Sequence, residues 1–166
     1  MILEFATKQL DAQPIVGIRT VVTHDKIGEA MGPLFGEVFG YIQQNGQAPA
    51  GMPFAIYYHM DSGPLEMDGE ECVDGGSIDM ECGMPVAAPL AGSGRIKASE
   101  LPAGKMATVT HMGPYNNLPQ TWSALTEWME AQGLQAAGAP WEVYVTDPGA
   151  EPDQSKWRTD IFFPVR

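Results

Sequence analysis

The sequence predicts an α+β protein in which a ββαββ unit occurs twice in tandem. Three observations predict this fold: an internal repeat, an apolar helical stripe in each copy, and short alternating segments typical of strands. We expect one domain over residues 1–166, made of a first repeat at 1–90 and a second at 93–166. Packing of the copies about a pseudo-two-fold axis would leave a ligand cleft between the halves.

The internal repeat is clearest in two segments that begin at Ile42 and Met129. IQQNGQAPAGMPFAIYYHMD aligns with MEAQGLQAAGAPWEVYVTDP without a gap, at an offset of 87 residues. The same offset places the Val-Thr-His of residues 22–24 on the Val-Thr-His of residues 109–111. Similarity of this breadth indicates a duplicated unit.

The first unit is predicted to begin with two strands, EFATKQL and PIVGIRTVVTH, and to continue with a helix from Ile27 to Asn45. Two further strands, FAIYYHM and SIDMECGMPV, complete it. The helix carries apolar residues at i, i+4, i+7 and i+11, a spacing that places them on one face. These residues are Met31, Phe35, Val38 and Ile42.

The second unit follows a linker with the sequence AAPLAGSG and has the same order of elements. Its predicted strands are GRIKASEL, KMATVTHM, WEVYVT and RTDIFFPV. Its helix has Asn116 or Asn117 as the N-cap, Pro119 in the first turn and Gly133 at the left-handed C-terminal position. The apolar stripe of this helix is Leu118, Trp122, Leu125 and Met129.

The acidic composition excludes several classes of function. Nine Lys and Arg residues against 21 Asp and Glu residues give a net charge of −12, which argues against direct nucleic-acid binding and against binding to an anionic membrane. Cys72 and Cys82 lack the spacing of a metal site, so we expect no metal, no cofactor and two free thiols. With neither a signal peptide nor a membrane-spanning segment in view, the sequence predicts a cytoplasmic protein.

Strand alternation divides the side chains of WEVYVT and WRTDIFFPV between two faces. We expect the more apolar face to pack on the helix. The residues on that face are Val143, Val145, Ile161 and Phe163. The residues expected to point away from the helix are Glu142, Tyr144, Asp160 and Phe162.

The repeat supplies partners for these acids. Alignment of SIDMECGMPV with WRTDIFFPV places Glu81 opposite Asp160, and Tyr57 mirrors Tyr144. If the halves pack about a two-fold axis, the acids and aromatic rings converge on the groove. Carboxylates neutralise a cation and ring faces attract it, so this combination is typical of a cation site.

The residues alone leave a second interpretation open. An acid in a terminal strand is usually solvated or paired with a neighbouring cation, and Arg158 and Arg95 are candidate partners for Asp160 and Glu142. Tyrosines likewise pack half-buried strands without any ligand. His111 lies at a strand end that is equivalent by repeat to His24, and this symmetry favours a structural role for both.

Three motifs of the second half carry a family resemblance: GPY before the helix, PWEVY in a strand, and TDIFFPV at the end. With them the chain resembles, over essentially its whole length, the GyrI-like small-molecule-binding domain. That domain is the effector-binding part of many AraC-type and MerR-type multidrug regulators, and it also occurs alone. Its fold is itself a tandem ββαββ duplication.

The resemblance implies a cleft that binds bulky, hydrophobic and often cationic compounds. It implies that Asp160 is the acid of the closing strand, where the family commonly has Glu, and that Glu142 is the acid of the EVY strand. It implies that Tyr115 and Tyr144 are aromatic walls. Together with the repeat, it gives a predicted ligand-binding set of Tyr57, Glu81, Tyr115, Glu142, Tyr144, Asp160 and Phe162.

Three functions follow as hypotheses. We expect a stand-alone binding protein for hydrophobic, cationic small molecules rather than an enzyme. The first alternative, implied by the family, is a hydrolase of electrophilic cyclopropane-containing toxins, with Glu142 as general base and Tyr57 or Tyr144 as proton donor. The second is an inhibitor of DNA gyrase or another DNA-binding enzyme, acting through the acidic stretch from Met60 to Cys82, which otherwise forms a solvated hairpin loop. A transcription regulator or gyrase is the expected protein partner.

Overall fold

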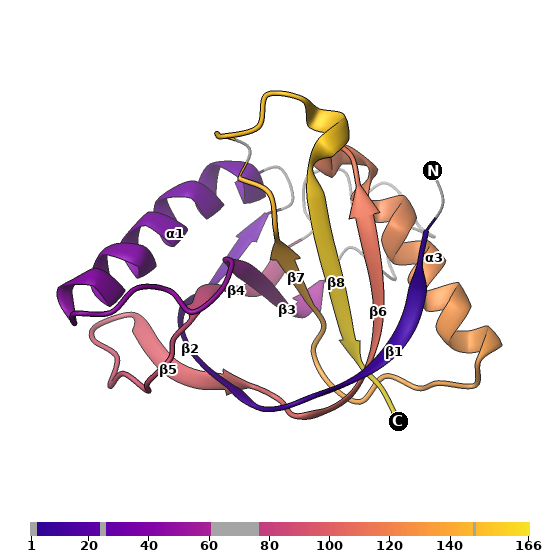
Figure 1. The fold of residues 1–166 in the computed structure, drawn as a ribbon, viewed down its shortest axis with the longest axis horizontal. Helices are drawn as coiled ribbons and strands as arrows, with labels where there is room; N and C mark the ends of the chain where they lie inside the picture. Colours follow the sequence, from indigo (N-terminus) through magenta and orange to yellow (C-terminus); the bar gives the residue numbers. More distant parts are fainter. Residues whose placement is uncertain (1–2, 24–25, 61–76, 148) are drawn as a thin grey trace. The chain divides into compact units, whose positions relative to one another are not determined.

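The computed structural model describes residues 3–23, 26–60, 77–147 and 149–166 of the chain. It confirms the α+β class, with antiparallel strands and two α-helices (Figure 1). The chain forms two compact units. One comprises Gln13–Leu101, and the other comprises Met1–Ala12 together with Pro102–Arg166.

In the unit Gln13–Leu101, the described residues form four antiparallel strands in the order β3-β4-β2-β5, together with the helix α1. Its elements are β2 (Gln13–Thr23), α1 (Ile27–Gln44), β3 (Phe54–Met60), β4 (Ser77–Pro85) and β5 (Ile96–Leu101). The long strand β2 pairs with β4 on one side and with β5 on the other. Leu34, Val38 and Ile42 are the buried residues of α1, so two of the four predicted stripe residues are fully buried.

The second unit contains four antiparallel strands in the order β1-β6-β8-β7, and α3 packs on β6 (Figure 1). Its elements are β1 (Phe5–Leu10), β6 (Gly104–Met112), the 3₁₀ turn η3 (Tyr115–Asn117), α3 (Leu118–Ala131), β7 (Trp141–Tyr144), the 3₁₀ turn η4 (Gln154–Lys156) and β8 (Arg158–Pro164). The predicted stripe of α3 packs into the core with Ile161 and Phe163, as expected.

The ends of α3 lie near the predicted positions. Asn117 is the N-cap residue, although its side chain makes no capping hydrogen bond, and a proline occupies the first turn. Gly133 has a φ of 73°, the left-handed conformation that glycine adopts without strain after a helix. Local sequence signals therefore define this helix well.

The first strands of the two predicted repeats, β1 and β5, are exchanged between the compact units. Strand β1 belongs to the unit that holds the rest of the second repeat, and β5 belongs to the unit that holds the rest of the first. Strand β1 pairs with β6, and β5 pairs with β2, so neither β1 nor β5 forms a hairpin with the strand that follows it. The connecting dipeptides are Asp11-Ala12 and Pro102-Ala103. Tight two-residue hairpins need positive φ, and no non-glycine residue of the described ranges adopts it. The predicted repeats at 1–90 and 93–166 describe the duplication of the sequence, and they remain a prediction.

One cysteine lies in the described part of the chain. Cys82 is buried in β4, and burial raises the pKa of its thiol to about 12. Cys72 and most of the acidic stretch, residues 61–76, lie outside the described residues. Among the residues that are described, no group of three or more His, Cys, Asp or Glu side chains forms a metal site, and no helix is long and apolar enough to cross a membrane.

Candidate ligand-binding site

The carboxylate of Glu142 lies on the face of the sheet that α3 covers. In the ladder between β7 and β8, Glu142 is opposite Ile161 and Tyr144 is opposite Thr159. Residues directly opposite in an antiparallel pair share a face, and Ile161 belongs to the core beneath α3. Glu142 and Tyr144 therefore point toward the helix.

This orientation corrects the sequence prediction, which placed Glu142 and Tyr144 on the face away from the helix. The prediction assumed that only the helix face would be apolar. Trp141 stacks on Phe162 on the other face, with ring centroids 5.6 Å apart, and Trp141 is 2% exposed. Because β7 is buried on both faces, apolar character does not identify the helix side.

Both oxygens of the Glu142 carboxylate accept hydrogen bonds from aromatic residues. The indole Nε1–H of Trp122 donates to Oε1 at 2.5 Å, and the Tyr144 hydroxyl donates to Oε2 at 2.7 Å. The side chain is only 4% exposed. Burial of a carboxylate is costly, and these two donors compensate part of that cost.

Further aromatic rings extend from Tyr144, the donor to this carboxylate. Tyr115 packs edge-to-face on Tyr144, with centroids 5.8 Å apart, and against Trp157 at 5.1 Å. Burial raises the pKa of Tyr115, and the negative charges of Glu142 and Asp147 raise that pKa further.

The position of Tyr115 is fixed by a buried histidine. His111 is 0% exposed, and its two ring nitrogens lie 2.7 Å from Thr121 Oγ1 and 3.1 Å from the Pro114 carbonyl oxygen. A carbonyl only accepts, so Nε2–H donates to Pro114, and in the neutral ring Nδ1 accepts from Thr121. The histidine thus ties the turn before Tyr115 to the first turns of α3. These contacts agree with the structural role predicted for His111; the same role predicted for His24 lies outside the described residues.

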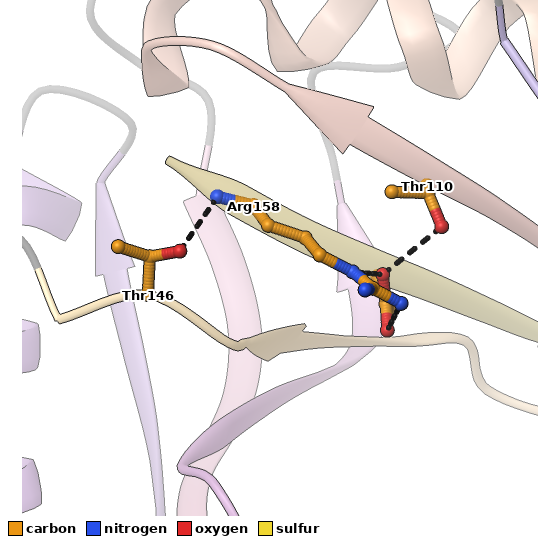
Figure 2. Close-up of polar contacts among 4 residues, drawn as sticks. Thr110, Thr146 and Arg158 are labelled. Atoms are coloured by element: carbon orange, nitrogen blue, oxygen red, sulfur yellow. Dashed lines mark hydrogen bonds and ion pairs between the residues drawn. The ribbon is translucent and has the colours of Figure 1, made fainter. Parts of the chain in front are cut away.

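Asp160 lies on the opposite face of β8 from Ile161. The guanidinium of Arg158 donates to both of its carboxylate oxygens, from Nε at 2.9 Å and from Nη2 at 3.1 Å, and Thr110 Oγ1 donates at 3.1 Å. Figure 2 shows the Arg158 side chain running along the strand to this carboxylate, while its backbone N–H donates to Thr146. Of the two candidate cations, Arg158 pairs with Asp160, and Arg95 pairs with Glu37.

We expect Asp160→Asn to lower the free energy of unfolding by no more than about 1 kcal/mol, because the Arg158 side chain is 48% exposed and solvent screens the pair. Chemical denaturation of the two proteins at matched pH measures the difference. A loss several times larger would show that the carboxylate contributes more than this exposed ion pair.

A second buried acid, Glu81, lies in the unit Gln13–Leu101. It is 5% exposed, and the Tyr58 hydroxyl donates to its Oε1 at 2.7 Å. The Arg19 guanidinium lies 3.9 Å from the centroid of the Tyr58 ring and forms an ion pair with Asp79. Burial, followed by the hydrogen bond to Glu81, raises the pKa of Tyr58.

The structure brings three of the seven predicted ligand-binding residues together: Tyr115, Glu142 and Tyr144. Asp160 and Phe162 lie on the other face of their sheet, and Tyr57 and Glu81 belong to the other compact unit. Trp122 and Trp157 were missed. Trp122 was assigned to the helical core stripe, although a partly buried indole N–H needs an acceptor and so points to a polar neighbour.

Comparison with known proteins identifies the family of the chain. The family model described as the GyrI-like small molecule binding domain matches residues 3–166. Comparison with curated protein sequences gives no match.

Several solved structures share the fold. The C-terminal domain of EcmrR is 22% identical, with a TM-score of 0.77, and the match covers 100% of this chain and 99% of that domain. In an EcmrR–DNA complex the identity is 22% and the TM-score 0.80, over 99% of this chain but only 57% of the EcmrR chain. This chain therefore spans little more than half of that relative.

Two other structures are more distant. SAV2435 bound to tetraphenylphosphonium is 15% identical, with a TM-score of 0.65, over 98% of this chain and 94% of that one. A hydrolase from Listeria innocua is 12% identical, with a TM-score of 0.64, over 98% and 92% of the two chains. At these identities the solved structures establish the shared fold. The family model, which covers nearly every residue, shows that the chain belongs to the GyrI-like small-molecule-binding domain family.

Proposed function

We propose that this protein binds bulky, hydrophobic cations through the Glu142 carboxylate and the aromatic residues around it. The observation that carries the proposal is a buried carboxylate held by two aromatic donors, Trp122 and Tyr144. Tyr115 and Trp157 supply further ring faces beside it. The proposal does not draw on Tyr57, Glu81, Asp160 or Phe162. We also propose that the chain arose by duplication of a ββαββ unit and that the protein is cytoplasmic.

Desolvation favours this class of ligand. A lipophilic cation spreads its charge beneath apolar groups, so its removal from water costs less than that of a compact ion. Glu142 has already been desolvated by folding, and the attraction between opposite charges is stronger in a low-dielectric site. Ring faces add cation–π attraction of about 0.5–2 kcal/mol each. The relative SAV2435, which binds tetraphenylphosphonium, supports this choice of probe.

The test is a titration with tetraphenylphosphonium, followed by tryptophan fluorescence, beside the neutral triphenylphosphine oxide. Trp122 and Trp157 lie in the site, so binding is expected to quench their emission. Saturable one-to-one binding of the cation, at least tenfold tighter than that of the neutral compound, is the expected result. The absence of saturation at millimolar concentration, or equal affinity for both compounds, would contradict the proposal.

A hydrolase is the second candidate, because the 2.7 Å hydrogen bond between Tyr144 and Glu142 also suits general acid–base chemistry. In this scheme Glu142 accepts a proton from water while the water oxygen bonds to a carbon of a cyclopropane ring. The strained C–C bond breaks, and Tyr144 protonates the carbon that receives the electron pair. The proton on Glu142 then returns to the Tyr144 phenolate along their hydrogen bond, and the net reaction is the addition of water.

Incubation of an electrophilic cyclopropane compound with excess protein, followed by mass spectrometry, tests this scheme. A product heavier by one water, formed by the wild type and lost in Glu142→Gln, would support it. An unchanged substrate after many hours would rule it out. The inhibitor hypothesis rests on an acidic stretch that lies mostly outside the described residues, and no observation in the described part of the chain favours it.

A further inference from the structure

A buried hydroxyl beside the candidate site lacks a hydrogen-bond partner. Thr159 is 0% exposed, and its Oγ1 is the one buried side-chain nitrogen or oxygen without a partner in the described ranges of the chain. Most buried polar groups in native proteins are paired, because an unpaired one retains the cost of its desolvation. Such an exception calls for a functional or structural reason.

The strand register places Thr159 among residues of the site. Its neighbour in β6 is His111 and its neighbour in β7 is Tyr144, and all three share the face that α3 covers. Both ring nitrogens of His111 already have hydrogen-bond partners, and the Tyr144 hydroxyl donates to Glu142. The nearest polar side chains on either side are therefore engaged elsewhere.

The aromatic residues place Thr159 next to the proposed binding site. Tyr115 contacts Tyr144, which is beside Thr159 in the next strand, and Trp157, which lies two residues before Thr159 along the chain. Thr159 is thus close to both residues whose rings Tyr115 contacts. A ligand bound at Tyr144 would therefore lie close to Thr159 in the next strand and to the Glu142 carboxylate.

We propose that Thr159 determines ligand specificity by forming a hydrogen bond to a polar group on the bound cation. This inference rests on the proposed function, and it narrows the ligand class to bulky aromatic cations that carry a hydroxyl or a comparable hydrogen-bonding group. In the free protein the Thr159 hydroxyl has no hydrogen-bond partner, and a ligand of this class supplies one.

The first arm of the test measures the stability of the free protein. Thr159→Val replaces the hydroxyl by a methyl group of similar size, and we expect the Tm to rise by about 2–4 °C. The matched control is Thr121→Val, which removes a hydroxyl that is hydrogen-bonded to His111 and is expected to lower the Tm. A fall in Tm for Thr159→Val would mean that the hydroxyl is already satisfied, for instance by an internal water, and would overturn the inference.

The second arm measures affinity for tetraphenylphosphonium and for the 2-, 3- and 4-hydroxyphenyl derivatives of triphenylphosphonium. We expect the wild type to bind at least one hydroxylated probe about tenfold more tightly than the parent cation, which is the size of one net hydrogen bond. Thr159→Val should reduce that ratio to about one, and Thr159→Ser, which keeps the hydroxyl, should preserve it.

The two arms separate the inference from the function on which it rests. Wild-type protein that binds the parent cation but shows no preference for any hydroxylated probe, or a preference that survives in Thr159→Val, overturns the role of Thr159 alone. Wild-type protein that binds none of the four cations overturns the proposed function and this inference with it.

Discussion

Glu142→Gln is expected to weaken the binding of tetraphenylphosphonium by about 10- to 100-fold, which corresponds to about 1.4–2.8 kcal/mol. The substitution removes the charge that attracts the cation and preserves the size of the side chain. It also leaves only one acceptor oxygen for the two donors Trp122 and Tyr144. Isothermal titration calorimetry of both proteins at the same ionic strength measures the loss.

A matched control separates this local effect from a change in net charge. Glu130 is an exposed residue of α3, so Glu130→Gln changes the total charge equally without touching the site. Its affinity for the cation should stay within about twofold of the wild type, because solvent and salt screen an exposed charge. Equal losses in the two variants would mean that Glu142 acts only through the overall field of this acidic protein.

Gly83→Ala is expected to lower the free energy of unfolding by about 3 kcal/mol, or to prevent folding. Gly83 is opposite Gly17 in one ladder and opposite Phe54 in the next. A Cβ at position 83 would lie 2.4 Å from the Val16 carbonyl oxygen and 3.0 Å from the Phe54 ring. A backbone oxygen within a ladder cannot move aside without loss of the adjoining hydrogen bonds. Urea denaturation measures the change.

Gly36→Ala is the matched control for this effect. Gly36 is an exposed residue of α1, and a Cβ there would meet no atom within 4 Å. Alanine has the higher helix propensity, so this variant should gain about 0.5–1 kcal/mol. A similar loss of stability at both positions would show that the close approach of β2 and β4 is not the cause.

Much of the fold could be predicted from the sequence because it depends on local and periodic signals. The apolar stripe of α3 places Leu118, Leu125 and Met129 in the core, and Gly133 ends that helix as expected. The pairing of the strands could not be predicted in the same way. Alternation shows that β1 and β5 are strands, but it does not say which neighbour each one joins.

The candidate site was predicted only in part, because alternation along a strand does not show which of its faces meets the helix. The carboxylate of Glu142 was identified, but its face was assigned wrongly because Trp141 covers the other side of β7 equally well. In β3 the register shifts between Tyr57 and His59, and the Tyr58 hydroxyl is hydrogen-bonded to Glu81. A pattern of strict alternation does not predict a bulge. A bulge shifts the register and so changes which side chain lies beside a given acid.

The central claim is that the Glu142 carboxylate responds to the positive charge of a ligand. The most direct measurement is the ratio of affinities for tetraphenylphosphonium and the neutral triphenylphosphine oxide, determined by calorimetry in the wild type and in Glu142→Gln. We predict a ratio of at least about ten in the wild type, falling to about one in the variant. A ratio that is unchanged by the substitution would contradict the claim, because the preference for a cation would then arise elsewhere in the protein.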